Sequence, residues 1–194
     1  NQAGPHEQLH AIVSKHAQST FRKPLSPASI AAYKLAIAEW RRDGRQLIID
    51  AGCGVGLSTR RLAALNPDSF VIGVDQSEDR LQRDIRWIGT PPENFVAVRA
   101  DLVDFWRLML ADDVHPAKHY LLYPNPWPKK AQVGRRWHAH PVFPAVIALG
   151  GQIECRSNWQ IYIEEFANTL TQLSGVQSRA EHFIDRKEHT SELQ

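Results

Sequence analysis

Short apolar runs alternate with helical patterns along most of the chain. Five runs have the length and composition of buried strands, and they are Leu47–Asp50, Phe70–Asp75, Phe95–Arg99, His119–Tyr123 and Gln152–Ser157. Helices are expected between and after them, at Ser58–Leu65, Glu78–Ile88, Leu102–Leu110, Val142–Leu149 and from a cap at Ser157 or Asn158 to Leu173. This alternation predicts an α/β fold with a doubly wound, mostly parallel sheet that carries helices on both faces.

The two ends of the chain have different patterns. Residues 1–45 predict a helical, partly basic N-terminal extension, in which Ser26 and Pro27 can start a helix over Ile30–Trp40. The tail from Val176 has a weaker pattern, for which one or two further strands are expected. A length of 194 residues fits a single domain over residues 1–194.

Composition and charge narrow the class of protein. No apolar run reaches the roughly 20 residues that cross a bilayer, so no membrane partner is expected. Two isolated thiols, Cys53 and Cys155, favour a reducing cytoplasm over a disulfide framework. A net charge of +2 excludes a polyelectrolyte binder, but four cations lie within eight residues: Lys129, Lys130, Arg135 and Arg136. Such a cluster can hold phosphates, although a solvated loop would look the same.

A glycine loop, DAGCGVG, follows the first predicted strand. It begins at Asp50 and has glycines at 52, 54 and 56, directly before a predicted helix. Glycine allows a tight turn and a close ligand approach, and the helix N-terminus suits an anionic group. The dinucleotide fingerprint needs a third glycine where this chain has Leu57, so a nicotinamide site is disfavoured. The spacing Gly52, Gly54, Gly56 instead resembles the S-adenosylmethionine loop of class I methyltransferases.

Acidic residues follow the next two predicted strands. Asp75 ends the second strand, where a carboxylate can accept hydrogen bonds from ribose hydroxyls. Asp101 follows the third, where it can accept one from the exocyclic amine of an adenine. We assign their neighbours Gln76 and Leu102 to the same cofactor site. The alternative, a glycine-rich turn without a ligand, does not account for three such features at successive strand ends.

The segment PNPWPKK follows the fourth predicted strand. Asn125 lies between two prolines, and its amide can both donate to and accept from the edge of a base. Trp127 offers a stacking face. The cations after it could then hold RNA phosphates. A proline-rich surface loop with its tryptophan in the core is the alternative interpretation.

These segments together resemble the tRNA (guanine-N7-)-methyltransferase family. Members carry a PDPWPKK-like motif, a basic stretch ending in paired arginines, and a strand leading into a TDW-like motif; this chain has YPNPWPKKAQVGRR and GGQIECRSNWQIY. The similarity covers roughly Phe21 to Leu170 and includes the lead-in FRKPLSP. It implies a Rossmann-like class I methyltransferase fold, S-adenosyl-L-methionine as cofactor, and methyl transfer to guanine N7 in tRNA or another structured RNA. It also implies that Asn125 acts at the reacting base, and that Trp127, Asn158 and the four clustered cations bind RNA.

The chain departs from that family at two motif positions and near its end. Asn125 and Asn158 stand where the family has aspartates, and EHFIDRK, Glu181–Lys187, matches the family's T-x-F-E segment only loosely. Neutral amides bind a base less strongly than carboxylates do. Two alternatives therefore stay open: a homologue with little or no turnover that acts as an RNA-binding or partner subunit, and a methyltransferase of small molecules.

Four histidines could suggest a metal site, and they are His115, His119, His138 and His140. No acid or cysteine completes a ligand set at the usual spacing. We therefore expect no metal and interpret these histidines as solvated loop residues.

Overall fold

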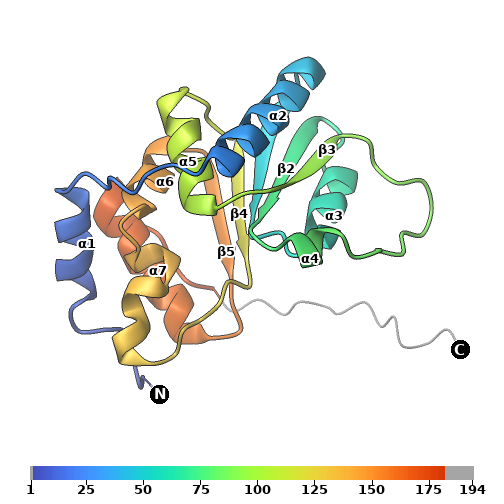
Figure 1. Ribbon diagram of the computed structural model, residues 1–194. Helices are drawn as coiled ribbons and strands as arrows, with labels where there is room; N and C mark the ends of the chain where they lie inside the picture. The colour runs from blue at the N-terminus through green and yellow to red at the C-terminus, as the bar shows by residue number, and fades with distance from the viewer. Residues whose placement is uncertain (1, 182–194) are drawn as a thin grey trace, which may run out of the picture.

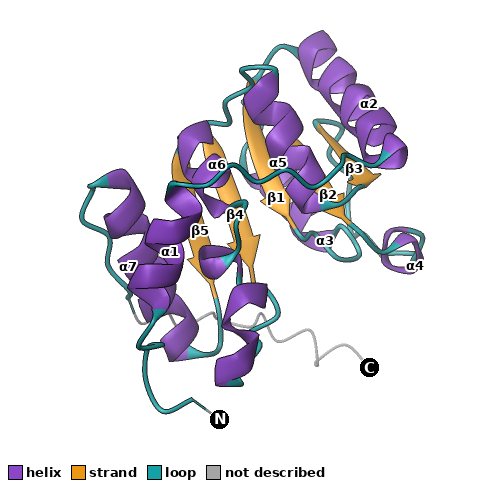
Figure 2. Ribbon diagram, turned by 60° about the vertical axis from the view of Figure 1, so that its left-hand side comes forward, coloured by secondary structure: helices purple, strands orange, loops and turns teal. Residues whose placement is uncertain are grey.

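Five parallel strands form the centre of the molecule in a computed structural model that describes residues 2–181. The strand order is β3-β2-β1-β4-β5, and the bounds are β1 Gln46–Ala51, β2 Ser69–Asp75, β3 Phe95–Arg99, β4 Lys118–Leu122 and β5 Gln152–Arg156. All neighbouring pairs are parallel, so the arrowheads point to one edge of the sheet (Figure 2). β1 lies in the middle and is almost entirely buried, as expected for a parallel strand covered on both faces.

The helices form two layers around the sheet (Figures 1 and 2). Their bounds are α1 Leu9–Ala17, α2 Pro27–Asp43, α3 Leu57–Leu65, α4 Glu78–Leu81, α5 Leu102–Ala111, α6 Phe143–Leu149 and α7 Gln160–Ser174, with short 3₁₀ helices η1 Lys130–Arg135 and η2 Trp137–Ala139. α2, α5, α6 and α7 pack into one large core on one face, whereas α3 covers β1 and β2 on the other. α1 lies against α7 and η2 at the side of the molecule.

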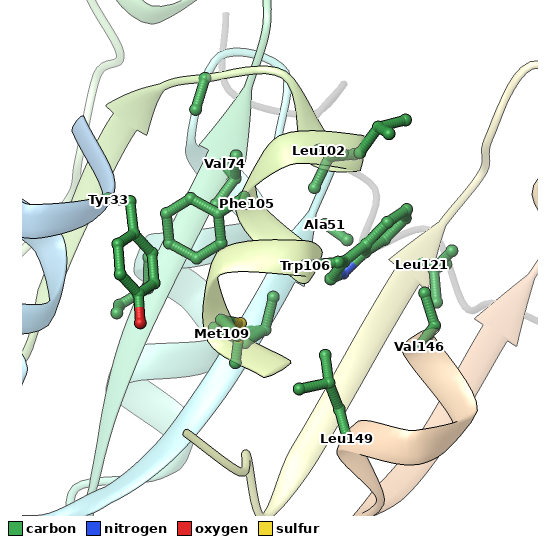
Figure 3. Packing of buried hydrophobic residues seen from close by; sticks show 14 of the residues in the cluster. Tyr33, Ala51, Val74, Leu102, Phe105, Trp106, Met109, Leu121, Val146 and Leu149 are labelled. Atoms are coloured by element: carbon green, nitrogen blue, oxygen red, sulfur yellow. The ribbon is translucent and has the colours of Figure 1, made fainter. Parts of the chain in front are cut away.

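The larger core is built around α5. Figure 3 shows Phe105, Trp106 and Met109 of this helix, all completely buried, between the sheet and the neighbouring helices. Tyr33 of α2 meets Phe105 edge-to-face, with ring centroids 5.2 Å apart. Such contacts add to the burial of apolar area and orient the helix on the sheet. The start of α5 is therefore held rigidly at the edge to which the strands point.

The opposite face has a much closer approach between helix and sheet. A Cβ atom added at Gly73 of β2 would lie 2.3 Å from Oγ1 of Thr59 in α3. Only glycine lets α3 settle this near to β2. The beginning of α3 is thereby fixed next to the loop that follows β1.

The predicted α/β fold and the five predicted strands are confirmed, with ends within about one residue. The prediction of a helix over Glu78–Ile88 is wrong beyond Leu81, where the chain becomes irregular. The physical reason lies in burial: Ile88 is 82% exposed, so a longer helix would have no covered apolar face to stabilise it.

Ser157 and Asn158 do not cap α7, which begins after Trp159 without a side-chain cap. Residues 176–181 contain no strand, and the rest of the tail, with most of EHFIDRK, lies outside the described residues.

Two further features bear on the class of protein. Within residues 2–181, no helix is long and apolar enough to cross a membrane. Cys53 is buried and Cys155 is half-buried, and both are free thiols.

His119 is a buried histidine in the middle of β4, not the solvated residue that we expected. It has no exposed surface, and its Nε2 accepts a hydrogen bond of 2.9 Å from the indole N–H of Trp106. Burial lowers the pKa of His119 to about 4. The imidazole is therefore neutral in the folded protein at neutral pH.

This shift predicts a loss of stability in mild acid. The folded-state pKa lies below the unfolded value of roughly 6.5, so the unfolded chain binds a proton first as the pH falls. We expect the free energy of unfolding to drop by about 2 kcal/mol from His119 between pH 7 and pH 5. Urea unfolding at both pH values measures this drop. His119→Asn, which cannot titrate, should show a smaller pH dependence by that amount; an unchanged dependence would contradict the assignment.

Candidate functional site at the carboxyl edge of the sheet

The loops that follow the five strands meet along one edge of the sheet. β1 pairs with β2 on one side and β4 on the other, and β4 pairs with β5. The glycine loop therefore lies between the turn after β2 and the PNPWPKK segment. In open α/β sheets this carboxyl edge is the usual place for ligands. The structure thus brings together the segments that the sequence singled out.

The glycine loop adopts a backbone that requires glycine. Gly52, Gly54 and Gly56 have φ angles of 79°, 58° and 82°. A Cβ atom at Gly54 would meet no described atom within 4 Å, so the loop is open on that side. Gly56 is also the N-cap of α3, whose first amides point toward this loop. The loop can consequently accept a ligand at close range to its backbone.

Asp50 is the acid at the start of this loop and is 1% exposed. Its Oδ2 accepts hydrogen bonds of 2.6 and 2.8 Å from the hydroxyls of Ser58 and Thr59, which tie α3 to β1. Its Oδ1 is buried and has no hydrogen-bond partner among the described atoms. Burial raises the pKa of Asp50, and the two hydroxyls lower it only in part. An unmatched acceptor in this position is suited to a donor from a ligand.

Asp75, at the end of β2, organises the neighbouring turn. Its Oδ2 accepts a hydrogen bond of 2.9 Å from the Gly54 amide, and its Oδ1 accepts one of 2.8 Å from the Ser77 amide. A carboxylate has about four acceptor positions, so these two bonds leave capacity for ribose hydroxyls. Gln76 is exposed beside it, and its carbonyl faces Arg99 at 3.4 Å. The turn after β2 is therefore preformed.

Asp101 caps α5 and also binds a cation from the N-terminal extension. Its Oδ1 accepts a hydrogen bond of 2.9 Å from the Val103 amide, and its Oδ2 lies 2.6 Å from Nζ of Lys23. A hydrogen bond to Asp101 raises the pKa of Lys23, so this ammonium is charged at neutral pH. Leu102 is buried, and its Cδ1 lies 4.0 Å from the Cβ position of Gly52. Lys23 is not among the residues that the sequence pattern predicts at the candidate cofactor site, yet it contacts one of them.

Asn125 and Asn158 lie in loops that follow neighbouring strands. Leu122 and Arg156 are partners in the β4–β5 register, and the Tyr123 amide donates to the Arg156 carbonyl at 2.8 Å. Both asparagines are exposed. The two amides thus lie on adjacent loops at the carboxyl edge of the sheet.

Three of the four clustered cations are exposed, as expected for residues that meet a polyanion. The guanidinium carbon of Arg135 lies 4.8 Å from the centre of the Trp127 ring. Lys130 pairs with Glu7 of the N-terminal segment, while Lys129 is exposed next to it. The alternative placement of Trp127 deep in the core is not observed, because its side chain is only half-buried.

The prediction that Arg136 contacts RNA is wrong for this structure. Its side chain is completely buried and forms a 2.6 Å ion pair with Glu165 of α7, which is also completely buried. Glu165 was not predicted as a functional residue, although the sequence contains a signal for it. Tyr162, Glu165, Phe166 and Thr169 recur at helical spacing on the buried face of α7. A single acid on such a face indicates a buried partner.

The remaining histidines do not form a metal site. His138 is buried against Glu165 and His115 contacts Asp113, at 2.8 Å in each case. Across residues 2–181, no cluster of three or more His, Cys, Asp and Glu side chains is placed to hold a metal ion. The expectation of solvated loop histidines is also wrong for His138, which is 1% exposed.

Comparison with known proteins identifies related sequences. A tRNA (guanine-N(7)-)-methyltransferase of Burkholderia mallei (strain ATCC 23344) is 28% identical over 84% of this chain and 64% of its own length. One of Ralstonia nicotianae is 25% identical over 85% of this chain and 68% of its own length. The chain thus spans slightly less than two thirds of the first of these relatives.

A solved structure supports the fold. The antibiotic-resistance methyltransferase Kmr superposes with a TM-score of 0.52 at 18% identity, over 87% of this chain and 92% of that one. The family model Methyltransf_4, described as "Putative methyltransferase", matches residues 44–192. Since this match covers most of the chain, the protein belongs to that methyltransferase family.

Proposed function

We propose that this protein transfers a methyl group from S-adenosyl-L-methionine to RNA, and that its substrate is guanine N7 in a tRNA. The observation that carries the proposal is the placement of two sets of residues along one sheet edge. A glycine loop with three nearby acids lies beside a loop that offers an amide, an aromatic ring and cations. Relatives at 25–28% identity are named for this reaction.

The residues around the glycine loop fit this cofactor. The buried and unmatched Oδ1 of Asp50 is an acceptor without a donor, and Gly54 leaves open space for a ligand. Asp50, Asp75 and Asp101 offer carboxyl oxygens that can accept hydrogen bonds from the ammonium, hydroxyl and amine groups of S-adenosylmethionine. Gly52, Gly54, Gly56, Gln76 and Leu102 would complete its surroundings. When bound, the cofactor supplies an electrophilic methyl group.

The residues on the adjoining loops would orient the base. Guanine N7 attacks through a lone pair and carries no proton, so no general base is required. The protein has to hold N7 in line with the methyl–sulfur bond and exclude water. Asn125 and Asn158 would bind the edge of guanine, and Trp127 would pack against it. Lys129, Lys130 and Arg135 would hold the phosphates around the entry.

A second candidate is an RNA-binding subunit with little or no turnover. The two asparagines favour it, because neutral hydrogen bonds are roughly half as strong as charge-assisted ones. The same exposed cations would retain RNA in that case. We also propose a cytoplasmic location, supported by the two free thiols.

We predict that Gly54→Ala weakens cofactor binding at least tenfold in isothermal titration calorimetry with S-adenosylmethionine. The added methyl group would occupy the open side of the loop. Gly44→Ala is the matched control, because Gly44 also has a positive φ of 80° and open space, but it lies before β1, away from the site. Both variants should lose about 1 kcal/mol of stability from backbone strain. Equal cofactor affinities in the two variants, or no binding by the wild type at millimolar ligand, would contradict the cofactor assignment.

We predict that unmodified tRNA transcripts incubated with the protein and S-adenosylmethionine acquire N7-methylguanosine, detected by nucleoside mass spectrometry. Charge reversal at Lys129 and Lys130 should lower kcat/KM for tRNA at least tenfold, through lost phosphate contacts. The control reverses Lys34 and Arg42 on the exposed side of α2, which changes the net charge equally. RNA retention without methylation would favour the binding subunit instead. An unchanged rate of turnover after charge reversal at Lys129 and Lys130 would favour a small-molecule substrate.

We predict that Asn125→Asp raises kcat/KM for tRNA methylation about tenfold, because a carboxylate accepts stronger hydrogen bonds from the base. Asn158→Asp should act in the same direction. Initial rates of methyl incorporation at neutral pH measure both. Unchanged rates in both variants would show that these amides do not contact the base.

A further inference from the structure

The backbone of the PNPWPKK loop, Pro124–Lys130, has a conformation that its own sequence does not favour. Tyr123, directly before the loop, and Trp127, within it, have positive φ angles of 53° and 47°. For bulky residues such a conformation is costly and persists only where the surroundings enforce it. The loop must therefore be fixed by contacts from outside its own sequence.

Arg136 and Gln2 supply those contacts through three consecutive carbonyl groups. Nη2 and Nε of Arg136 donate to the Trp127 carbonyl at 2.9 and 3.2 Å, and Nη2 also lies 3.5 Å from the Lys129 carbonyl. The backbone amide of Gln2 donates to the Pro128 carbonyl at 3.2 Å. Three consecutive carbonyls of the loop are thus bound by Arg136 and Gln2, while the side chains of Asn125 and Lys129 are exposed.

Glu165 anchors this arrangement to α7. Its Oε2 accepts from Nη1 of Arg136 at 2.6 Å and from His138 at 2.8 Å. Its Oε1 accepts from the Gln2 side chain and the His6 amide, each at 2.7 Å. Burial would raise the pKa of Glu165, but hydrogen bonds from His138, Arg136 and Gln2 bring it down to about 2. The carboxylate therefore stays charged over the whole working range of pH.

The paired arginines contact Trp127 in two different ways. Arg135 stacks on its ring from the solvent side, whereas Arg136 binds its carbonyl from the interior. The guanidinium carbon of Arg136 also lies 4.9 Å from the centre of the Trp159 ring, directly after Asn158. One buried side chain consequently touches both loops that carry the candidate base-binding amides.

We propose that Arg136 is a positioning residue for methyl transfer. Together with Glu165 and Gln2 it forms a buried latch, which sets the orientation of Trp127 and the distance between the Asn125 and Asn158 loops. This inference rests on the proposed function. A buried ion pair is weak evidence for stability, since apolar replacements of equal volume often fold as well. The latch therefore acts on the geometry of the loop more than on the stability of the domain.

Arg136→Lys tests this role. A lysine keeps the charge, but its single ammonium cannot bind the Trp127 carbonyl and Glu165 in the fork geometry of a guanidinium. We expect kcat for tRNA methylation to fall at least tenfold, while the Kd for S-adenosylmethionine changes less than twofold. Leu149→Ala is the control for stability, because it opens a cavity in the core next to the start of β5, at the amino edge of the sheet and opposite the site. It should lower the melting temperature at least as much and leave kcat within twofold. A wild-type kcat in Arg136→Lys, or equal kcat losses in the two variants, overturns the proposal.

Hydrogen exchange of the segment 123–133 gives a readout that needs no activity. We expect its amides to exchange at least tenfold faster in Arg136→Lys than in the wild type or in Leu149→Ala. Equal exchange rates in Arg136→Lys and the wild type overturn the latch, even if the enzyme is active. If the wild type does not methylate tRNA but the segment exchanges faster in Arg136→Lys, the proposed function is overturned and the latch is not. If Arg136→Lys does not fold, the double variant Arg136→Met with Glu165→Met takes its place, because it leaves no unpaired buried charge. The kcat for methylation and the hydrogen exchange of segment 123–133 are then measured in this double variant, and the same results support or overturn the latch.

Discussion

The pairing of β1 between β2 and β4 is the constraint on which the rest of the structure depends. Because every neighbouring strand is parallel, all five carboxyl ends lie at one edge. Segments up to about a hundred residues apart in the chain, such as Asp50 and Asn158, thereby become neighbours in one site region. A shift of one residue in β1 would turn Asp50 away from Ser58 and Thr59, since successive side chains point to opposite faces. The arrangement of side chains in the candidate site thus depends on the register of β1 with its neighbouring strands.

Ionisable groups that are buried close to this edge need hydrogen-bond partners. Some of them have a full set of partners in this protein, and others do not. Arg136 and Glu165 satisfy each other and several backbone groups, which leaves a rigid unit. Asp50 has one satisfied oxygen and one unmatched oxygen. An unmatched buried acceptor costs free energy in the absence of a ligand and returns it on binding. The contrast separates the buried residues that support the loops from Asp50, whose unmatched oxygen we propose to accept a hydrogen bond from the bound cofactor.

The fold and the glycine loop were predictable because their signals are local. Each strand is a short apolar run, and each loop glycine is needed by its own φ angle. The prediction of a helix over Glu78–Ile88 was wrong beyond Leu81, because helical spacing alone does not show whether other elements will cover the apolar face of the helix. Arg135 and Arg136 are identical neighbours with opposite environments, and the difference comes from Glu165, 29 residues away, and Gln2, 134 residues away. No local pattern specifies such partners.

Under the proposed function, the two asparagines at 125 and 158 would change the balance between binding RNA and orienting a base. Asp50, Asp75 and Asp101 lie at this edge of the sheet, where Lys23 pairs with Asp101 and a guanidinium nitrogen of Arg80 lies 3.7 Å from Asp75. In the proposed RNA complex, carboxylates at 125 and 158 would place negative charge on the loops next to Lys129 and Lys130 and would weaken the attraction of these lysines for phosphate. Neutral amides remove that repulsion but hold guanine less firmly. Under the proposed function, the exposed cations would retain RNA and the two amides would hold the base less firmly, so RNA affinity and the rate of methyl transfer would depend on different residues.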